Sequence, residues 1–105
     1  MKIGDQILLF DKTDAHLCTF TVDRVDPEFL SGTFLTTENF DTVRRLFERY
    51  ADMVEENCFG QTDEVLDQIQ DFGIYGKTEG VRTDVFDIQI YGDHGSLRLQ
   101  LFRPI

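Results

Sequence analysis

The sequence has no tryptophan, only two cysteines and two prolines, and no apolar run near the roughly 18 residues that span a bilayer. The two cysteines, Cys18 and Cys58, and the two histidines are widely spaced and show no zinc-site pattern, and nothing in the sequence supports a disulfide. The apolar run at residues 7–10 ends at Asp11, which is too short for a signal peptide. We therefore expect a cytoplasmic protein with reduced thiols and no membrane association.

Basic residues are also scarce, since ten Lys and Arg stand against twenty Asp and Glu and give a net charge of −10. Proteins that bind nucleic acids use clustered positive charge to displace counterions from phosphates. Here the basic residues are scattered, and only Arg44 and Arg45 are adjacent. This pattern disfavours binding to DNA or to an anionic membrane. It permits a basic protein partner or a metal cation.

Apolar residues are plentiful, at 41% of the chain, and ten phenylalanines are among them. That content is enough for one modest core, so we expect a single domain over residues 1–105. Alternating or continuous apolar patterns bounded by turn residues predict strands. These strands are expected at residues 5–11, 16–24, 29–36, 74–83 (a short strand and a loop), 85–91 and 96–102.

Between the third and fourth strands the period changes to that of a helix. Apolar residues recur at three- and four-residue spacing from Phe40 to Val54 and predict an amphipathic helix. Gly60 interrupts this pattern, Thr62 begins a second helix, and Gly73 is placed to end it. The N-cap candidates for the first helix are Thr36, Thr37 and Asn39.

The expected order is β-β-β-α-α-β-β-β. It predicts an α+β fold, a twisted antiparallel sheet of five to six strands with both helices packed on one face. Segments 32–40 (GTFLTTENF), 46–59 (LFERYADMVEENCF) and 84–91 (DVFDIQIY) resemble a group of small acidic bacterial proteins that have no assigned activity. The resemblance implies a soluble bacterial α+β domain and carries over no catalytic residues.

Acidic residues gather around the break between the two helices. Glu55 and Glu56 lie at the negative end of the first helix, and Asp52 forms a like-charge pair with Glu56 at i,i+4. Each effect costs about a few tenths of a kcal/mol, which a solvated surface tolerates. Local rules broken together also mark functional surfaces. Two interpretations stay open, a solvated surface and an acidic patch that faces a partner.

Strand alternation places several apolar residues on the sheet face away from the helices: Leu8, Phe10, Tyr91 and Phe102. A polar sheet face with a few aromatic residues is common where another protein or a twin subunit binds. Sheet curvature would be the other way to bury these side chains. The residues that we expect to face a partner are Asp52, Glu55, Glu56, Tyr91 and Phe102.

The candidate motifs for catalysis, cofactor binding or metal binding lack residues that these functions require. The Gly-Lys-Thr at 76–78 has Asp71 where a phosphate-binding loop needs glycine. A calcium loop that starts at Glu55 would place Phe59 and Leu66 at ligand positions, although a looser carboxylate site remains open. We assign no catalytic, cofactor-binding or metal-binding residue.

We therefore expect a non-enzymatic small acidic protein-interaction module, in its most specific version an inhibitor or immunity-like protein. Its partner would be a basic protein or, as a homodimer, a second copy. The alternative is a small carboxylate-dependent enzyme or a divalent-cation-binding protein.

Overall fold

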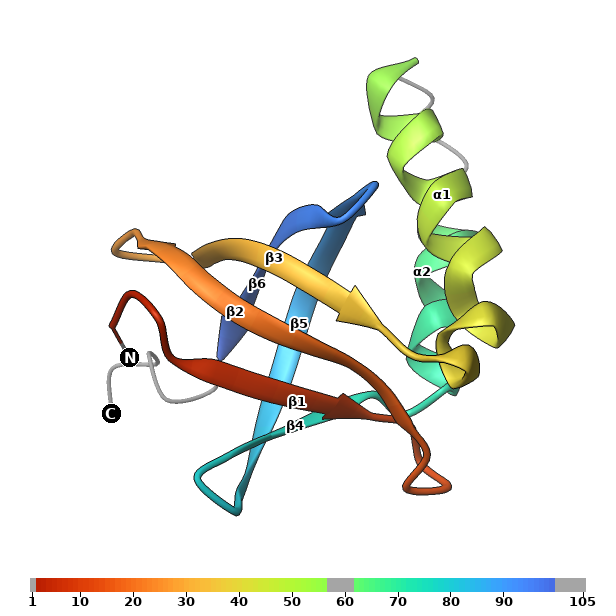
Figure 1. Cartoon of the computed structure of the whole chain (residues 1–105). Helices are drawn as coiled ribbons and strands as arrows, with labels where there is room; N and C mark the ends of the chain where they lie inside the picture. The colour runs from red at the N-terminus through yellow and green to blue at the C-terminus, as the bar shows by residue number, and fades with distance from the viewer. Residues whose placement is uncertain (1, 57–61, 100–105) are drawn as a thin grey trace.

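The computed structural model describes residues 2–56 and 62–99 (Figure 1). Its six strands are β1 (Gln6–Phe10), β2 (His16–Val25), β3 (Leu30–Thr36), β4 (Tyr75–Thr78), β5 (Val81–Tyr91) and β6 (His94–Leu99). A short 3-10 turn, η1 (Glu38–Phe40), and two helices, α1 (Asp41–Glu55) and α2 (Thr62–Asp71), lie between β3 and β4 in the chain.

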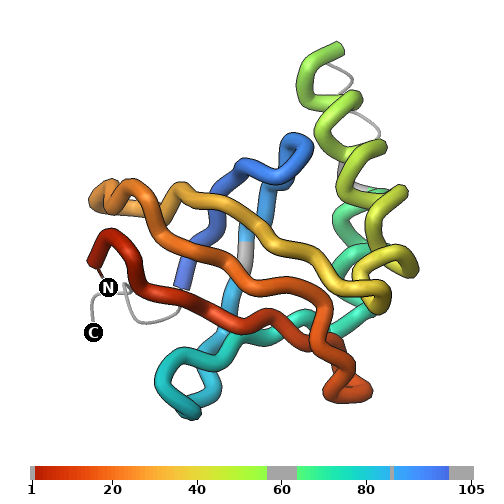
Figure 2. The backbone as a smooth tube through the Cα atoms, viewed as in Figure 1, coloured from red at the N-terminus to blue at the C-terminus, as the bar shows by residue number. Residues whose placement is uncertain are grey.

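The sheet is a closed antiparallel barrel in the order β1-β2-β3-β6-β5-β4. It closes because β1 pairs with β2 on one side and with β4 on the other, which Figure 2 shows in the backbone trace. The expected open sheet with two helices on one face is therefore wrong. Alternation determines which side chains share a face, but the pairing of Leu8 with Lys77 joins parts of the chain that are far apart in sequence.

Breaks in strand register help the sheet to curve. Shifts occur in β1 between Leu9 and Phe10, in β2 between Val22 and Arg24, and in β5 between Phe86 and Gln89. Such bulges bend the strand and increase its local twist, which a closed sheet needs.

One core fills the barrel and continues beneath the helices. Inside the barrel the rings of Phe20 and Phe34 are stacked, with their centroids 4.7 Å apart. Val43 and Phe47 of α1 and Val65 of α2 belong to the same buried cluster. The apolar faces of both helices are therefore satisfied by the strands and by each other.

The helical segment is tied to the start of β2. The Thr37 hydroxyl donates to the carbonyl oxygens of His16 at 2.5 Å and Leu17 at 3.0 Å, and the Asn39 side chain also donates to the His16 carbonyl. Neither η1 nor α1 has a side-chain N-cap, so the expected caps at Thr37 and Asn39 instead link the helix to the barrel.

Both helices lie together beside the barrel, past the end of β3 (Figure 1). They have 15 and 10 residues. In the described part of the chain, no helix has the length and apolar character to cross a membrane.

Candidate functional site

A row of carboxylates runs along one side of α1. Glu48, Asp52 and Glu55 are spaced at i, i+4 and i+7, and all three are exposed. Residues at this spacing share one side of a helix and, at 1.5 Å per residue, span roughly 10 Å along its axis. The helix therefore presents a linear array of negative charge.

The turn between β5 and β6 lies opposite this row. Ala51 of α1, Ile90 and Tyr91 at the end of β5, and Gly92 of the turn complete a hollow of about 230 Å³ with the three acids. Tyr91 is 40% exposed, and its hydroxyl donates to the Gln89 side chain at 3.1 Å. The hollow thus has carboxylates on one wall and an aromatic ring on the other.

A second hollow, of about 250 Å³, continues from the first toward the start of α1. Both are lined by Glu48, Ile90 and Gly92, so they form one continuous depression, here called the α1 groove. The second part adds Asp93 and Arg44 to its polar lining.

Arg44 fixes a positive charge at this end of the α1 groove. Its guanidinium lies over the Phe40 ring at 5.0 Å from the centroid. It also contacts Asp41 and the Thr36 hydroxyl, both at 3.2 Å. The groove therefore carries charged residues over an apolar floor, with Arg44 at one end and Glu55 toward the other.

Three of the five residues expected to face a partner come together here. Asp52, Glu55 and Tyr91 line the α1 groove. Tyr91 was expected on the sheet face away from the helices, and its place beside α1 corrects that prediction. Glu56 is exposed at the end of α1, where its amide donates to the Asp52 carbonyl, but it does not line the groove. Phe102 lies outside the described residues.

Sequence reasoning missed two acids of the groove. Glu48 could have been predicted, because it precedes Asp52 by four residues and so lies on the same side of the helix. Asp93 lies in the turn after β5, and no local pattern connects that turn to α1. Among the other acids of the helix break, Glu64 and Asp67 are exposed on α2 and do not line the groove, and the Asp63 side chain lies outside the described part of the structure.

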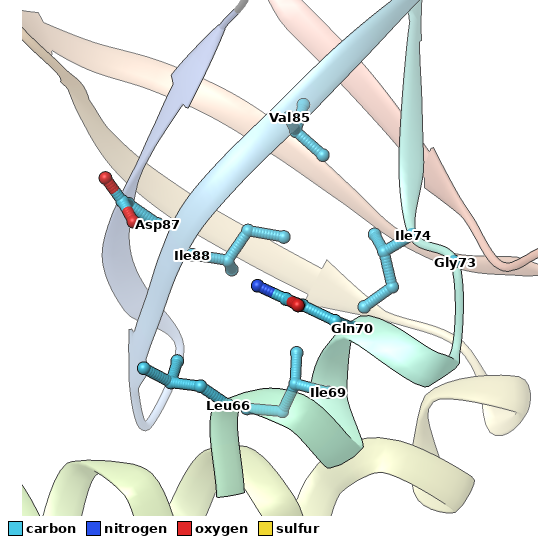
Figure 3. Close-up of a pocket in the computed structure, with 8 residues that line it drawn as sticks. All are labelled: Leu66, Ile69, Gln70, Gly73, Ile74, Val85, Asp87 and Ile88. Atoms are coloured by element: carbon cyan, nitrogen blue, oxygen red, sulfur yellow. The ribbon is translucent and has the colours of Figure 1, made fainter. Parts of the chain in front are cut away.

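An apolar cavity of about 220 Å³ lies between α2 and β5 (Figure 3). Its walls are mainly the aliphatic side chains of Leu66, Ile69, Ile74, Val85 and Ile88. Figure 3 shows the Gln70 amide reaching into this space, whereas the Asp87 carboxylate points away from it. The cavity therefore combines apolar walls with one amide group.

Asp87 has a strained backbone at the β5 bulge. Its φ of 53° is in the left-handed region, which costs most residues about 1–2 kcal/mol. Its carboxylate contacts Arg98 at 3.4 Å, and Arg98 also lies 3.7 Å from Glu28.

Burial raises the pKa of the Tyr50 hydroxyl, and the nearby Tyr91 and Asp87 raise it further.

The structure gives little support to a catalytic or metal-binding site at the histidines, cysteines and acids that it describes. The side chains of Asp93 and His94 are in contact at 3.4 Å, but both are exposed. Cys18 is buried, and burial raises its pKa to about 12, so at neutral pH it is not a thiolate nucleophile. Cys58 lies outside the described residues. Within residues 2–56 and 62–99, no three His, Cys, Asp or Glu side chains converge as metal ligands.

No protein-family model, curated protein or solved structure matches this chain. The resemblance of segments 32–40, 46–59 and 84–91 to small acidic bacterial proteins therefore stays a prediction.

Proposed function

We propose that the protein is a non-enzymatic interaction module that binds a basic segment of another protein in the α1 groove. In its most specific version it is an inhibitor or immunity-like protein. The observation that carries the proposal is the position of Tyr91, which faces the acidic row of Glu48, Asp52 and Glu55 across a hollow with Ile90 and Ala51 among its lining.

The chemistry of the groove suits lysine and arginine side chains. A cation over the face of Tyr91 gains about 0.5–1 kcal/mol at an exposed site. A neighbouring carboxylate adds a charge-assisted hydrogen bond, and the aliphatic stem of the cation packs against Ile90 and Ala51. Exposed ion pairs contribute little singly, so several must act together along the groove.

The two ends of the α1 groove differ in charge. Arg44 lies near Glu48 and Asp93 and is paired with Asp41, whereas the charged residues that line the other end are all acidic. The basic residues of the partner are therefore expected toward the Glu55 end.

The charge of the whole chain favours capture of such a partner. With a net charge of −10, the protein attracts basic molecules before contact. Complementary charge raises association rates by roughly 10- to 1,000-fold and loses this effect as salt is added. Binding is therefore expected to be fast and dependent on salt.

The test compares two variants with the same change in charge. A fluorescent arginine-rich peptide is titrated into the wild type, into Asp52→Lys/Glu55→Lys, and into Glu64→Lys/Asp67→Lys. The first pair lines the α1 groove and the second lies on α2. We expect the groove variant to weaken binding by about tenfold or more, because it replaces two attractive contacts of up to about 1 kcal/mol each with repulsive ones, and the α2 variant to weaken it far less.

Equal weakening by both variants would show that the peptide responds only to net charge, and the groove proposal would fail. Tyr91→Ala provides a second check, since it leaves the charge unchanged. Binding unaffected by Tyr91→Ala would remove the aromatic wall from the site.

The cavity at α2 favours a second candidate function, binding of a small apolar molecule. A cavity of about 150 Å³ lined by aliphatic and aromatic residues already binds benzene, and this one is about 220 Å³. The Gln70 amide would select a ligand with one hydrogen-bonding group, such as indole. Titration with indole should shift the NMR signals of Ile69 and Ile88, and Leu66→Phe, which fills the cavity, should abolish the shift. No shift in the wild type would exclude indole as a ligand of this cavity.

A further inference from the structure

The outer face of β5 and β6 has a hollow of about 290 Å³, here called the β5–β6 hollow. It is lined by Phe29, Asp87, Gln89, Ser96 and Arg98. Gln89 and Ser96 are paired across the two strands, whereas Phe29 comes from the turn between β2 and β3. Of these five residues none lines the α1 groove, and Asp87 alone also lines the apolar cavity beside α2. The β5–β6 hollow is therefore a third site.

Arg98 is held in this hollow by a carboxylate on each side. Its Nε lies 3.4 Å from an Asp87 oxygen, and its Nη2 lies 3.7 Å from a Glu28 oxygen. Asp87 belongs to the bulge of β5, and Glu28 belongs to the turn between β2 and β3. The two N–H groups of Nη1 take no part in these ion pairs. The guanidinium is therefore oriented before a ligand arrives and can still donate to it.

The backbone of Asp87 suits a residue that positions Arg98. Asp87 has a φ of 53°, a conformation that glycine adopts without strain. Figure 3 shows its carboxylate pointing away from the apolar cavity, and this carboxylate contacts Arg98. Bulges and strained residues are common at binding sites, because they direct a side chain in a way that a regular strand does not. The bulge therefore places the carboxylate that orients the guanidinium.

Three further groups give the hollow its chemistry. Phe29 is 39% exposed and contributes an aromatic ring. The Gln89 side chain accepts a hydrogen bond from the Tyr91 hydroxyl at 3.1 Å, which orients its amide and keeps its NH2 group as a donor. The Ser96 hydroxyl can donate or accept. The hollow thus combines an aromatic ring with several hydrogen-bonding groups.

We propose that the β5–β6 hollow binds an uncharged purine base. Asp87 and Glu28 oppose an anion, and Arg98 between them opposes a cation, so the charges favour a neutral ligand. A purine base is flat and aromatic, and it can stack on Phe29. Its edge carries hydrogen-bond acceptors next to donors, which match the Arg98 N–H groups next to the Asp87 carboxylate.

The size of the hollow and the charge of the chain restrict the ligand further. A cavity of about 150 Å³ holds one benzene ring, so a hollow of about 290 Å³ has room for two fused rings. A phosphate group would meet the net charge of −10 and the carboxylates beside Arg98. We therefore expect the free base or its nucleoside to bind in preference to a nucleotide.

The experiment is titration of adenine into the ¹⁵N-labelled full chain, followed by NMR. We expect the amide signals of Gln89 and Ser96 to shift with a Kd on the order of 0.1–1 mM, which suits a small ligand in an open site. Benzimidazole has the same fused-ring shape but lacks the polar edge of the six-membered ring, so it should bind about fivefold more weakly or less. Adenosine 5′-monophosphate should bind about fivefold more weakly than adenosine, because of its charge.

Variants test the two groups that would hold the base. Phe29→Ala should weaken adenine binding by about fivefold or more, and Phe29→Tyr should retain it, because only alanine removes the stacking ring. Arg98→Lys keeps the charge but loses the planar pair of donors, and it should also weaken binding by about fivefold or more. Leu35→Ala is the matched control, because Leu35 is 74% exposed in β3 and does not line the hollow. Circular dichroism checks the fold of each variant.

Several results would overturn the proposal. These are no shift at Gln89 or Ser96 with millimolar adenine, benzimidazole binding as tightly as adenine, and equal weakening by Leu35→Ala. Loss of adenine binding in Leu66→Phe would place the ligand in the apolar cavity instead. Asp52→Lys/Glu55→Lys should leave adenine binding unchanged, so this proposal and that of the α1 groove succeed or fail separately.

Discussion

Gly32 of β3 and Gly95 of β6 are directly paired, and neither position has room for a side chain. A Cβ atom at Gly32 would lie 2.0 Å from the Thr21 carbonyl oxygen and 2.7 Å from the Phe20 ring. At Gly95 it would lie 1.9 Å from the Gln89 carbonyl oxygen and 2.9 Å from the ring of Phe34. These two glycines allow the barrel to hold its stacked phenylalanine pair.

Gly32→Ala and Gly95→Ala should therefore each lower the free energy of unfolding by about 2–3 kcal/mol, because the added methyl group meets backbone that cannot rotate away. Urea denaturation measures the change. Ser31→Ala, at the neighbouring pair of β3 and β6, is the control and should change stability by less than about 0.5 kcal/mol. Wild-type stability in both glycine variants would mean that β3 does not lie this close to β2, nor β6 to β5, at these positions.

In a strand, alanine is normally more stabilising than glycine, and the strained backbone at Asp87 predicts the reverse order at this position. Both substitutions remove the carboxylate, but only alanine retains the cost of the left-handed conformation. Asp87→Gly should thus be more stable than Asp87→Ala by about 1 kcal/mol.

Asp84 of the same strand is the control for this effect, because its φ is not positive. There Asp84→Ala should be more stable than Asp84→Gly by about 0.5–1 kcal/mol. The same order at both positions, measured by thermal unfolding, would contradict the bulge at Asp87.

Burial of Cys18 predicts a loss of stability at alkaline pH. Its pKa is raised from 9.0 to about 12 in the folded protein, so the unfolded chain releases this proton first. The stabilisation is complete below pH 9 and declines as the pH rises from 9 toward 12. Cys18→Val removes the titrating group and should flatten the decline measured by urea denaturation between these values. An unchanged slope would show that the thiol is not buried.

The hydrogen bonds of Thr37 predict a link between the helical segment and β2. Thr37→Val keeps the shape of the side chain but removes its donor to His16 and Leu17. We expect the free energy of unfolding to fall by about 1–2 kcal/mol. Glu38→Ala, at the next and exposed position, should have an effect within about 0.5 kcal/mol. Equal effects at both positions would argue against this link.

Secondary-structure elements whose apolar residues recur with a regular period could be predicted from the sequence. The spacing from Phe40 to Val54 marked the helix that the structure places at Asp41–Glu55, and Gly73 ends α2 with a φ of 61°. The row of Asp52 and Glu55 follows from the same period. These features depend on residues within a few turns of each other, where geometry is nearly independent of the rest of the chain.

β5 shows where periodicity fails. A strand was expected at residues 85–91 with strict alternation, but β5 begins at Val81 and contains a bulge. Thr83 is buried before the bulge and Ile88 and Ile90 are buried after it, which one uniform period cannot describe. The extra residue shifts every later side chain to the opposite face.

The sequence by itself determined the local elements, the acidic surface charge and the helical row of carboxylates, because each depends on composition or on short-range geometry. Only the tertiary structure decided that the sheet closes and that Tyr91 faces those carboxylates. Both depend on pairings between residues distant in the chain, such as Leu8 with Lys77. The periodicity of a short segment does not reveal which distant segment it will pair with.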